Sequence, residues 1–144
     1  MKIRKGVFIV CYRKEGEKIL YLILKRKLHW RGWEFVKGGL EFKESIKKVA
    51  SRELKEETGQ HPVKLKKYPV TGKYFYGRKF KDRPGIKYQT YALYSAQLKN
   101  GKIKIDKKEH SSSKWVGYKK ALKLLTWPNQ RRCLRIVDAR LKNA

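Results

Sequence analysis

Two runs of apolar and β-branched residues open the chain, over residues 3–12 and 18–26. The polar residues 14–17 separate them and include Gly16. Short apolar runs that are bounded by turn-forming residues are typical of β-strands. We therefore expect an opening β-hairpin, followed by a short strand over residues 33–36.

Three more apolar runs predict further strands, over residues 63–70, 71–80 and 86–98. The last run alternates between apolar and polar positions well enough to be a central strand. The Asn100-Gly101 pair that follows it is typical of a tight turn, so we expect this pair to close a hairpin.

Three segments predict helices. Residues 44–58 contain no glycine or proline, and Gly59 can adopt the left-handed conformation that commonly ends a helix. Near the end of the chain, residues 119–125 predict a short helix. Pro128 suits the first turn of another helix, whose apolar residues would cover the sheet.

The helix predicted over residues 44–58 carries carboxylates on its apolar side. Four residues at helical spacing lie along one stripe: Ile46, Ala50, Glu53 and Glu57. Burying a carboxylate without a partner costs several kcal/mol. Glu53 and Glu57 therefore indicate that a positive partner lies inside the protein.

Glu53, Glu56 and Glu57 are related by steps of three and four residues, so their side chains can converge on a hard divalent cation such as Mg²⁺ or Mn²⁺. Arg52 precedes this set and can orient one of its carboxylates. The alternative is an ordinary amphipathic helix with exposed ion pairs. That alternative explains the charges but not their place on the apolar side, so we favour the cation site.

Length and composition favour one domain. The chain has 144 residues, 40% of them hydrophobic, and we expect residues 1–144 to share a single core. No segment approaches the run of about eighteen apolar residues that spans a membrane. Charges interrupt the apolar run at the N-terminus, unlike in a signal peptide. We expect a cytosolic protein that does not bind membranes.

Cys11 and Cys133 lie in apolar settings and are expected to be reduced core residues.

The net charge is +27, from 39 basic and 12 acidic residues. Such a charge attracts polyanions, RNA among them. A lysine-rich composition is also typical of thermophilic proteins, so the charge has two explanations that the sequence leaves open.

The acidic helix belongs to a longer pattern. Five elements occur at fixed spacing: Gly38, Glu44, Arg52-Glu53, Glu56-Glu57 and Gly59. This pattern resembles the Nudix box, with Gln60 where the family usually has an aliphatic residue. The resemblance implies an α/β fold, a Nudix α/β/α sandwich with a mixed β-sheet flanked by helices. It also implies a hydrolase that uses roughly one to three Mg²⁺ or Mn²⁺ ions.

Residues 33–41, WEFVKGGLE, resemble the sequence WxFPKGxxE of diadenosine tetraphosphate hydrolases and RNA 5'-pyrophosphohydrolases. Val36 replaces the proline, and Gly32 stands where many diadenosine enzymes have a histidine. The resemblance implies substrate contacts by four residues: Lys37, Tyr76, Lys87 and Trp127. For the tyrosine and the tryptophan, packing in the core is the alternative, and for Lys37 a surface position is the alternative.

Residues 109–116, EHSSSKWV, resemble the EHxxxxWV segment of the same enzymes, in which the glutamate reaches the metal cluster from outside the box. Glu109 is therefore implied as a fourth metal ligand. The family offers either Glu53 or Glu109 as the general base, with Arg52 holding Glu53. Glu44 is expected to be structural. His110 has no second chelating residue nearby in the sequence, so a surface position explains it equally well.

The resemblance leads us to expect the cleavage of a nucleoside diphosphate linked to another group, first of all of diadenosine tetraphosphate to ATP and AMP. Three alternatives remain open. They are an RNA 5'-pyrophosphohydrolase, a pyrophosphatase for oxidised deoxynucleoside triphosphates, and a nucleic-acid-binding module without catalysis. A nucleotide or dinucleoside polyphosphate is the expected partner, with RNA as a further possibility.

Overall fold

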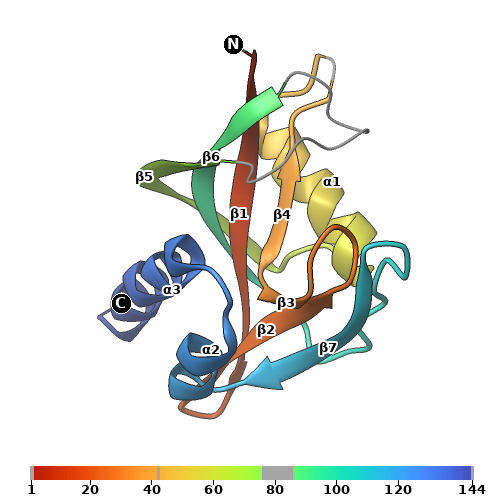
Figure 1. Ribbon diagram of the computed structural model, residues 1–144. Helices are drawn as coiled ribbons and strands as arrows, with labels where there is room; N and C mark the ends of the chain where they lie inside the picture. Colours follow the sequence, from red (N-terminus) through yellow and green to blue (C-terminus); the bar gives the residue numbers. More distant parts are fainter. Residues whose placement is uncertain (1, 42, 76–85, 144) are drawn as a thin grey trace.

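The computed structural model describes residues 2–41, 43–75 and 86–143, and the side chains of residues 4–41, 43–73 and 88–143. Its strands form one seven-stranded sheet (Figure 1). The strands are β1 (Lys2–Glu15), β2 (Lys18–Arg26), β3 (Gly32–Glu34), β4 (Val36–Gly39), β5 (Lys64–Phe75), β6 (Ile86–Gln97) and β7 (His110–Val116). The helices are α1 (Ile46–Thr58), α2 (Tyr118–Leu124) and α3 (Pro128–Lys142).

β1 lies at the centre of the sheet. It pairs antiparallel with β2 and β4 and parallel with β6. The main strand order is β3-β2-β1-β6-β5, and β7 pairs with β2. The predicted opening hairpin is confirmed, because β1 and β2 pair from Tyr12↔Tyr21 to Glu15↔Lys18. The prediction of β6 as a central strand is also confirmed.

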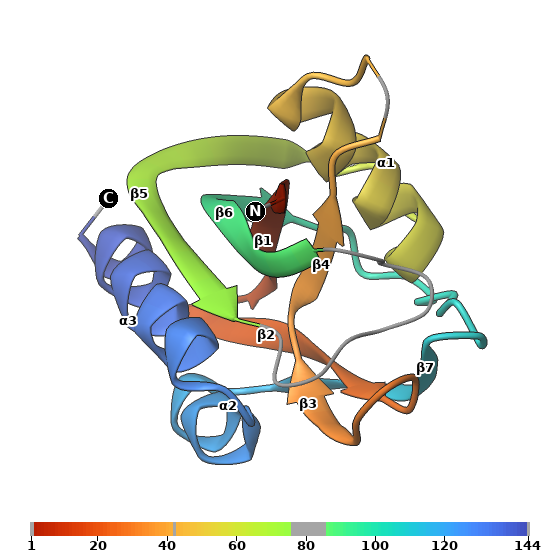
Figure 2. The ribbon, with the colours of Figure 1, turned by 45° about the horizontal axis from the view of Figure 1, so that its top comes forward.

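Helices cover both faces of the sheet (Figures 1 and 2). Alternate residues of β1 explain how: Val7 and Ile9 belong to a buried cluster that includes residues of α1, whereas Phe8 and Val10 belong to a second cluster with residues of α3. Because neighbouring residues of a strand point to opposite faces, one apolar strand supplies both cores. The expected α/β/α sandwich is confirmed.

Two predicted strands have different boundaries in the structure. The strand expected over residues 33–36 divides at Phe35, whose backbone N–H donates to Gln130 Oε1 at 2.7 Å instead of to a neighbouring strand. The part before Phe35, β3, thus pairs with β2, and the part after it, β4, pairs with β1. The strands expected over 63–70 and 71–80 form one strand, β5, whose pairing register shifts between Lys67 and Thr71. The end of that prediction, residues 76–80, lies outside the described residues.

The prediction of a hairpin at Asn100-Gly101 is wrong. After β6 the chain does not return along this strand, because the next strand, β7, pairs with β2. Ile103 and Ile105 pack against the cluster on the α1 side, and the N–H of Lys104 donates to the Thr58 carbonyl at 2.9 Å. Burial of these apolar side chains therefore holds the segment between β6 and β7 against the end of α1.

Helix α1 begins two residues later than predicted. Ser45 is its N-cap, and the side chain of Ser45 accepts a hydrogen bond from the N–H of Lys48 at 3.2 Å. The predicted end is confirmed, since Gly59 has φ 76° and caps the helix in the left-handed conformation.

Both cysteines, Cys11 and Cys133, are free and buried, as predicted. Of the helices in the described part of the chain, none has the length and apolar character needed to cross a membrane.

Candidate active site

Two carboxylates of α1 face the interior, as the helical spacing predicted. Glu57 is 1% exposed and Glu53 is 8% exposed, whereas the side chain of Glu56 is half exposed. Neither oxygen of Glu57 has a hydrogen-bond partner among the described residues. Burial raises the pKa of Glu57 well above its ordinary value, and the charges of Glu53 and Glu34 raise it further. This carboxylate is therefore a place where a cation would be stabilised.

Glu53 lies against the glycine pair at the end of β4. A Cβ added to Gly38 would come 2.1 Å from the carboxyl carbon of Glu53, so only glycine leaves room for this side chain. Burial raises the pKa of Glu53, although Arg52 acts in the opposite direction. The glycine at position 38 thus places a partly desolvated carboxylate beside Glu57.

Arg52 holds the acidic residues around it. Its Nε and Nη2 donate to the two oxygens of Glu44 at 2.8 and 2.9 Å, and its Nη1 donates to Glu53 Oε1 at 2.9 Å. Nη2 also donates to the Gly39 carbonyl at 2.9 Å. The hydrogen bond from Arg52 lowers the pKa of Glu44. The guanidinium therefore connects the loop before α1 to the helix and orients Glu53.

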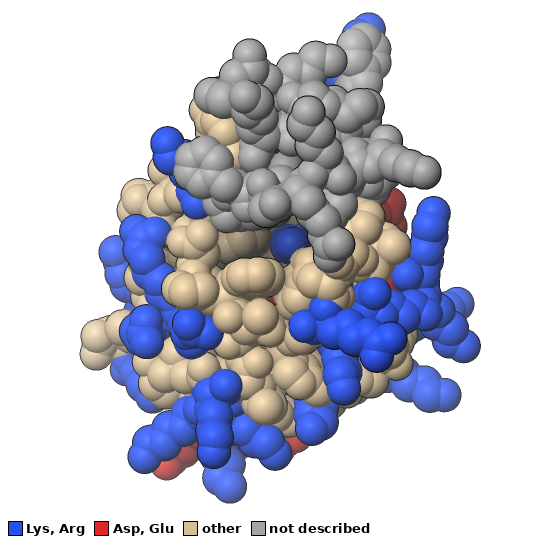
Figure 3. All heavy atoms as spheres, viewed as in Figure 1, with Lys and Arg blue, Asp and Glu red and all other residues tan. Residues whose placement is uncertain are grey.

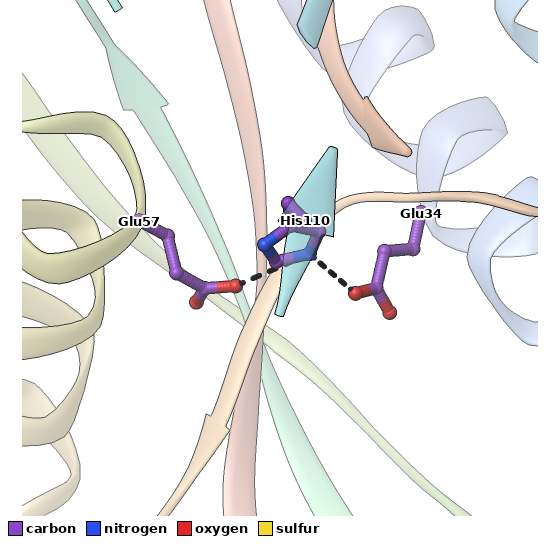
Figure 4. Close-up of side chains that lie close together, drawn as sticks. All are labelled: Glu34, Glu57 and His110. Carbon is purple, nitrogen blue, oxygen red and sulfur yellow. Dashed lines mark hydrogen bonds and ion pairs between the residues drawn. The ribbon is translucent and has the colours of Figure 1, made fainter. Parts of the chain in front are cut away.

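A second buried group lies beside Glu57 (Figure 4). His110, the first residue of β7, is fully buried, and its Nε2 lies 2.7 Å from Glu34 Oε2 and 3.7 Å from Glu57 Oε1. Glu34 ends β3 and is also fully buried. Its carboxylate lies 3.2 Å from Arg26 Nη1 and 3.4 Å from Lys37 Nζ. Figure 4 shows the imidazole between the two carboxylates.

The environments of the two carboxylates differ. Burial opposes the ionisation of Glu34, but Lys37, the hydrogen bond with His110 and Arg26 together hold the pKa of Glu34 down at about 2. Among the described residues, the ion-pair contact of Glu57 is to His110 at 3.7 Å, with no lysine or arginine within 4 Å. Glu34 is therefore a compensated charge, and Glu57 is an uncompensated one.

The structure brings some of the other predicted site residues close to this cluster. The charge of Glu109 raises the pKa of Glu57, and its carbonyl accepts from the Lys27 N–H at 2.9 Å. Lys37 contacts Glu34, as described above. Trp127 is 45% exposed, and its ring meets that of Trp30 edge to face with centroids 5.3 Å apart.

Two predicted contacts fall outside the description. Tyr76 lies outside the described residues, and Lys87 belongs to β6 but its side chain is not described. The sequence reasoning missed Glu34 and treated a surface position for His110 as equally good, which is wrong because His110 is buried. Glu34 lies between the aromatic residues Trp33 and Phe35 in a predicted strand. This position was the feature of the sequence that could have indicated a buried acid.

The donor set fits a hard divalent cation. Glu53, Glu56, Glu57 and Glu109 offer carboxylate oxygens, which Mg²⁺ and Mn²⁺ prefer as ligands. The two oxygens of Glu57, which have no hydrogen-bond partner among the described residues, are the strongest sign, since a buried carboxylate is ordinarily paired. Glu34, Glu57 and His110 also lie close enough together to be considered as a metal-binding group.

Comparison with protein families gives a match to the NUDIX domain over residues 2–135. The chain belongs to the Nudix family. The match covers nearly the whole sequence, and it agrees with the box residues that lie on α1 and on the strand and loop before it. A comparison with curated proteins found no match.

Solved Nudix structures are similar over most of their length. A Nudix hydrolase structure from Listeria monocytogenes is 26% identical with a TM-score of 0.80, covering 96% of this chain and 94% of that one. The C. elegans Ap4A hydrolase in a binary complex is 26% identical with a TM-score of 0.75, covering 98% and 99%. The E. coli dihydroneopterin triphosphate pyrophosphohydrolase, at 23% identity and a TM-score of 0.76 over 90% and 91%, shares the fold. Family and fold together identify this Nudix protein as a pyrophosphohydrolase.

Proposed function

We propose that this Nudix enzyme uses Mg²⁺ or Mn²⁺ to cleave a phosphoanhydride bond of a nucleoside diphosphate linked to another group. We further propose that its substrate is diadenosine tetraphosphate, which it cleaves to ATP and AMP. One observation carries the metal requirement. Glu57 is buried beside Glu53, and neither of its oxygens has a hydrogen-bond partner among the described residues. A bound cation would neutralise this charge. We expect the enzyme to work in the cytosol.

Four residues would hold the metal: Glu53, Glu56, Glu57 and Glu109. When bound, a divalent cation neutralises phosphate charge and lowers the pKa of a water molecule that it binds. The protein itself supplies positioning. Arg52 holds Glu53 by a hydrogen bond of 2.9 Å, and the missing side chain of Gly38 leaves room for that carboxylate. Lys37 would contact the phosphate chain as a point charge.

Two carboxylates are candidates for the general base that takes a proton from the attacking water. Glu53 is buried and held by Arg52, whereas Glu109 is half-buried in the turn just before β7. Both positions suit a base that acts next to the phosphate. Glutamine at each position separates them, because loss of the base lowers kcat even when the metal is saturating.

The choice of a dinucleotide rests on the aromatic surface near Lys37. The Nζ of Lys37 lies 5.6 Å from the centre of the Trp30 ring, and Trp30 contacts the half-exposed Trp127. Aromatic rings beside a phosphate-binding lysine are suited to hold a base next to its phosphates. The similarity to the C. elegans Ap4A hydrolase supports the same substrate.

A second candidate, RNA with a 5'-triphosphate, is favoured by the charge. The net charge is +27, and Figure 3 shows lysine and arginine side chains over much of the visible face. Such a surface would bind an RNA chain in a manner that depends strongly on salt. Oxidised deoxynucleoside triphosphates are a third candidate. A nucleic-acid-binding module without catalysis is disfavoured, since the whole carboxylate set is present.

The test is hydrolysis of diadenosine tetraphosphate, 5'-triphosphorylated RNA and 8-oxo-dGTP in parallel with Mg²⁺, with products separated by chromatography. ATP and AMP in equal amounts from the dinucleotide, at the highest kcat/KM of the three, are the expected result. Faster release of pyrophosphate from RNA would mean that RNA, and not the dinucleotide, is the substrate. RNA binding without any Mg²⁺-dependent product would refute the enzymatic proposal.

A further inference from the structure

One imidazole lies between two buried carboxylates. His110 comes from β7, Glu34 from β3 and Glu57 from α1 (Figure 4). All three side chains are at most 1% exposed. The sheet explains this meeting, because Arg26 at the end of β2 pairs with His110 in β7, while Leu24 two residues earlier pairs with Glu34 in β3. The end of α1 packs over the same part of the sheet.

The contacts of Glu34 leave it unsuited to bind a metal. Its Oε2 already contacts Arg26 Nη1 at 3.2 Å and His110 Nε2 at 2.7 Å, and its Oε1 lies 3.4 Å from Lys37 Nζ. A divalent cation at this carboxylate would lie close to two positively charged side chains. Glu57 differs, because neither of its oxygens has a hydrogen-bond partner among the described residues.

The contacts also decide which nitrogen of His110 carries hydrogen. A carboxylate that is paired with Arg26 and Lys37 can only accept hydrogen bonds, so Nε2 carries the hydrogen that it donates to Glu34. Nε2 also lies 3.7 Å from Glu57 Oε1, which is a close contact but not a hydrogen bond. Because Nε2 is a donor, it has no lone pair to offer to a metal. The lone pair is on Nδ1, which has no hydrogen-bond partner among the described residues.

We propose that His110, held by Glu34, is a positioning residue that directs the carboxylate of Glu57 toward the bound metal and does not bind the metal through Nε2. This inference rests on the proposed metal site. Arg26 and Lys37 anchor Glu34, Glu34 fixes the ring, and the ring limits how the carboxylate of Glu57 can turn. Partners that orient a metal ligand in this way typically change metal affinity by about 10- to 100-fold when they are removed.

Two variants with similar volume separate positioning from packing. His110→Gln keeps an N–H donor at the position of Nε2, whereas His110→Leu fills the space without any donor. We expect His110→Leu to weaken Mn²⁺ binding by about 10-fold or more and His110→Gln to weaken it by about threefold or less. Proton relaxation enhancement of water measures this affinity without substrate. Thermal unfolding in EDTA checks that both variants fold.

Electron spin echo measurements on bound Mn²⁺, with ¹⁵N-labelled histidine, test the second half of the proposal. With the label placed at Nε2, we expect no directly coordinated Nε2. A coordinated Nε2 would overturn the positioning role, and so would equal Mn²⁺ affinity in His110→Leu and the wild type. Equal damage in His110→Gln and His110→Leu, both folded, would also overturn it.

Failure of the proposed function gives a different result. A wild type that binds Mn²⁺ but hydrolyses none of the three substrates contradicts the proposed reaction while leaving the role of His110 measurable. A wild type that binds no Mn²⁺ contradicts the metal site and the positioning role together. Kinetics then add a check: His110→Leu should raise the Mg²⁺ concentration for half-maximal rate more than it raises KM for the nucleotide.

Discussion

Replacing Glu57 by glutamine should make the metal-free protein more stable. Glu57 is 1% exposed, its oxygens have no hydrogen-bond partner among the described residues, and Glu53 and Glu34 repel its charge. A buried polar group without a partner costs about 1–3 kcal/mol, and more when it is charged. Glutamine keeps the shape and removes the charge. We expect Glu57→Gln to raise the free energy of unfolding in EDTA by about 1–3 kcal/mol.

The assay is urea unfolding followed by circular dichroism, in EDTA and in excess Mg²⁺. A gain of this size corresponds to a rise in Tm of about 3–10 °C for a chain of this length. Mg²⁺ at about 100 times its Kd should stabilise the wild type by about 2.7 kcal/mol, and a Kd that is about 10-fold weaker in Glu57→Gln should reduce this effect to about 1.4 kcal/mol or less. Glu56→Gln is the matched control. Its side chain is 51% exposed, so its metal-free stability should change by less than about 0.5 kcal/mol.

The reasoning is refuted if Glu57→Gln unfolds in EDTA at the same urea concentration as the wild type or at a lower one. That result would mean that the carboxylate of Glu57 has a stabilising partner in the metal-free protein. The difference between Glu57 and Glu34 would then disappear, and with it the reason to place a cation at Glu57.

Three further predictions concern the same framework. Gly38→Ala should lower kcat/KM by about 10-fold or more, because its Cβ would come 2.1 Å from the carboxyl carbon of Glu53. Gly117→Ala should be neutral, because apart from its chain neighbours no atom of the described residues lies within 4 Å of the added Cβ. Arg52→Lys should lower kcat by about 10-fold or more in steady-state assays, because an ammonium cannot make the paired contacts of the guanidinium; an unchanged kcat would remove its positioning role. Cys133 should react with a thiol reagent at pH 8 only after unfolding, since burial raises its pKa to about 11, and rapid reaction of the folded protein would contradict this.

Local periodicity made the carboxylate helix predictable. The spacing of Ala50, Glu53 and Glu57 puts all three on one side of a helix, and the structure buries all three. The stop at Gly59 and the opening hairpin were likewise encoded by neighbouring residues. Signals of this kind depend on a few consecutive turns or pairs, so a single sequence is enough to read them.

The partnership of Glu34 and His110 was not predictable in this way. The two residues are separated by 76 positions, and their contact depends on β3 and β7 both pairing with β2. The sequence HSSSKWV has few apolar residues, so it did not predict a strand, although both of its ends are buried. Here the burial of His110 follows from the sheet as a whole and not from its neighbours in the sequence.

Equilibrium binding of Mn²⁺ to the wild type and to Glu57→Gln, measured by electron paramagnetic resonance of the free ion, tests the metal site most directly. We predict that the wild type binds at least one ion and that Glu57→Gln binds it about 10-fold more weakly or worse. Equal binding by both proteins, or no binding by the wild type, would contradict the assignment of Glu57 as the buried metal ligand.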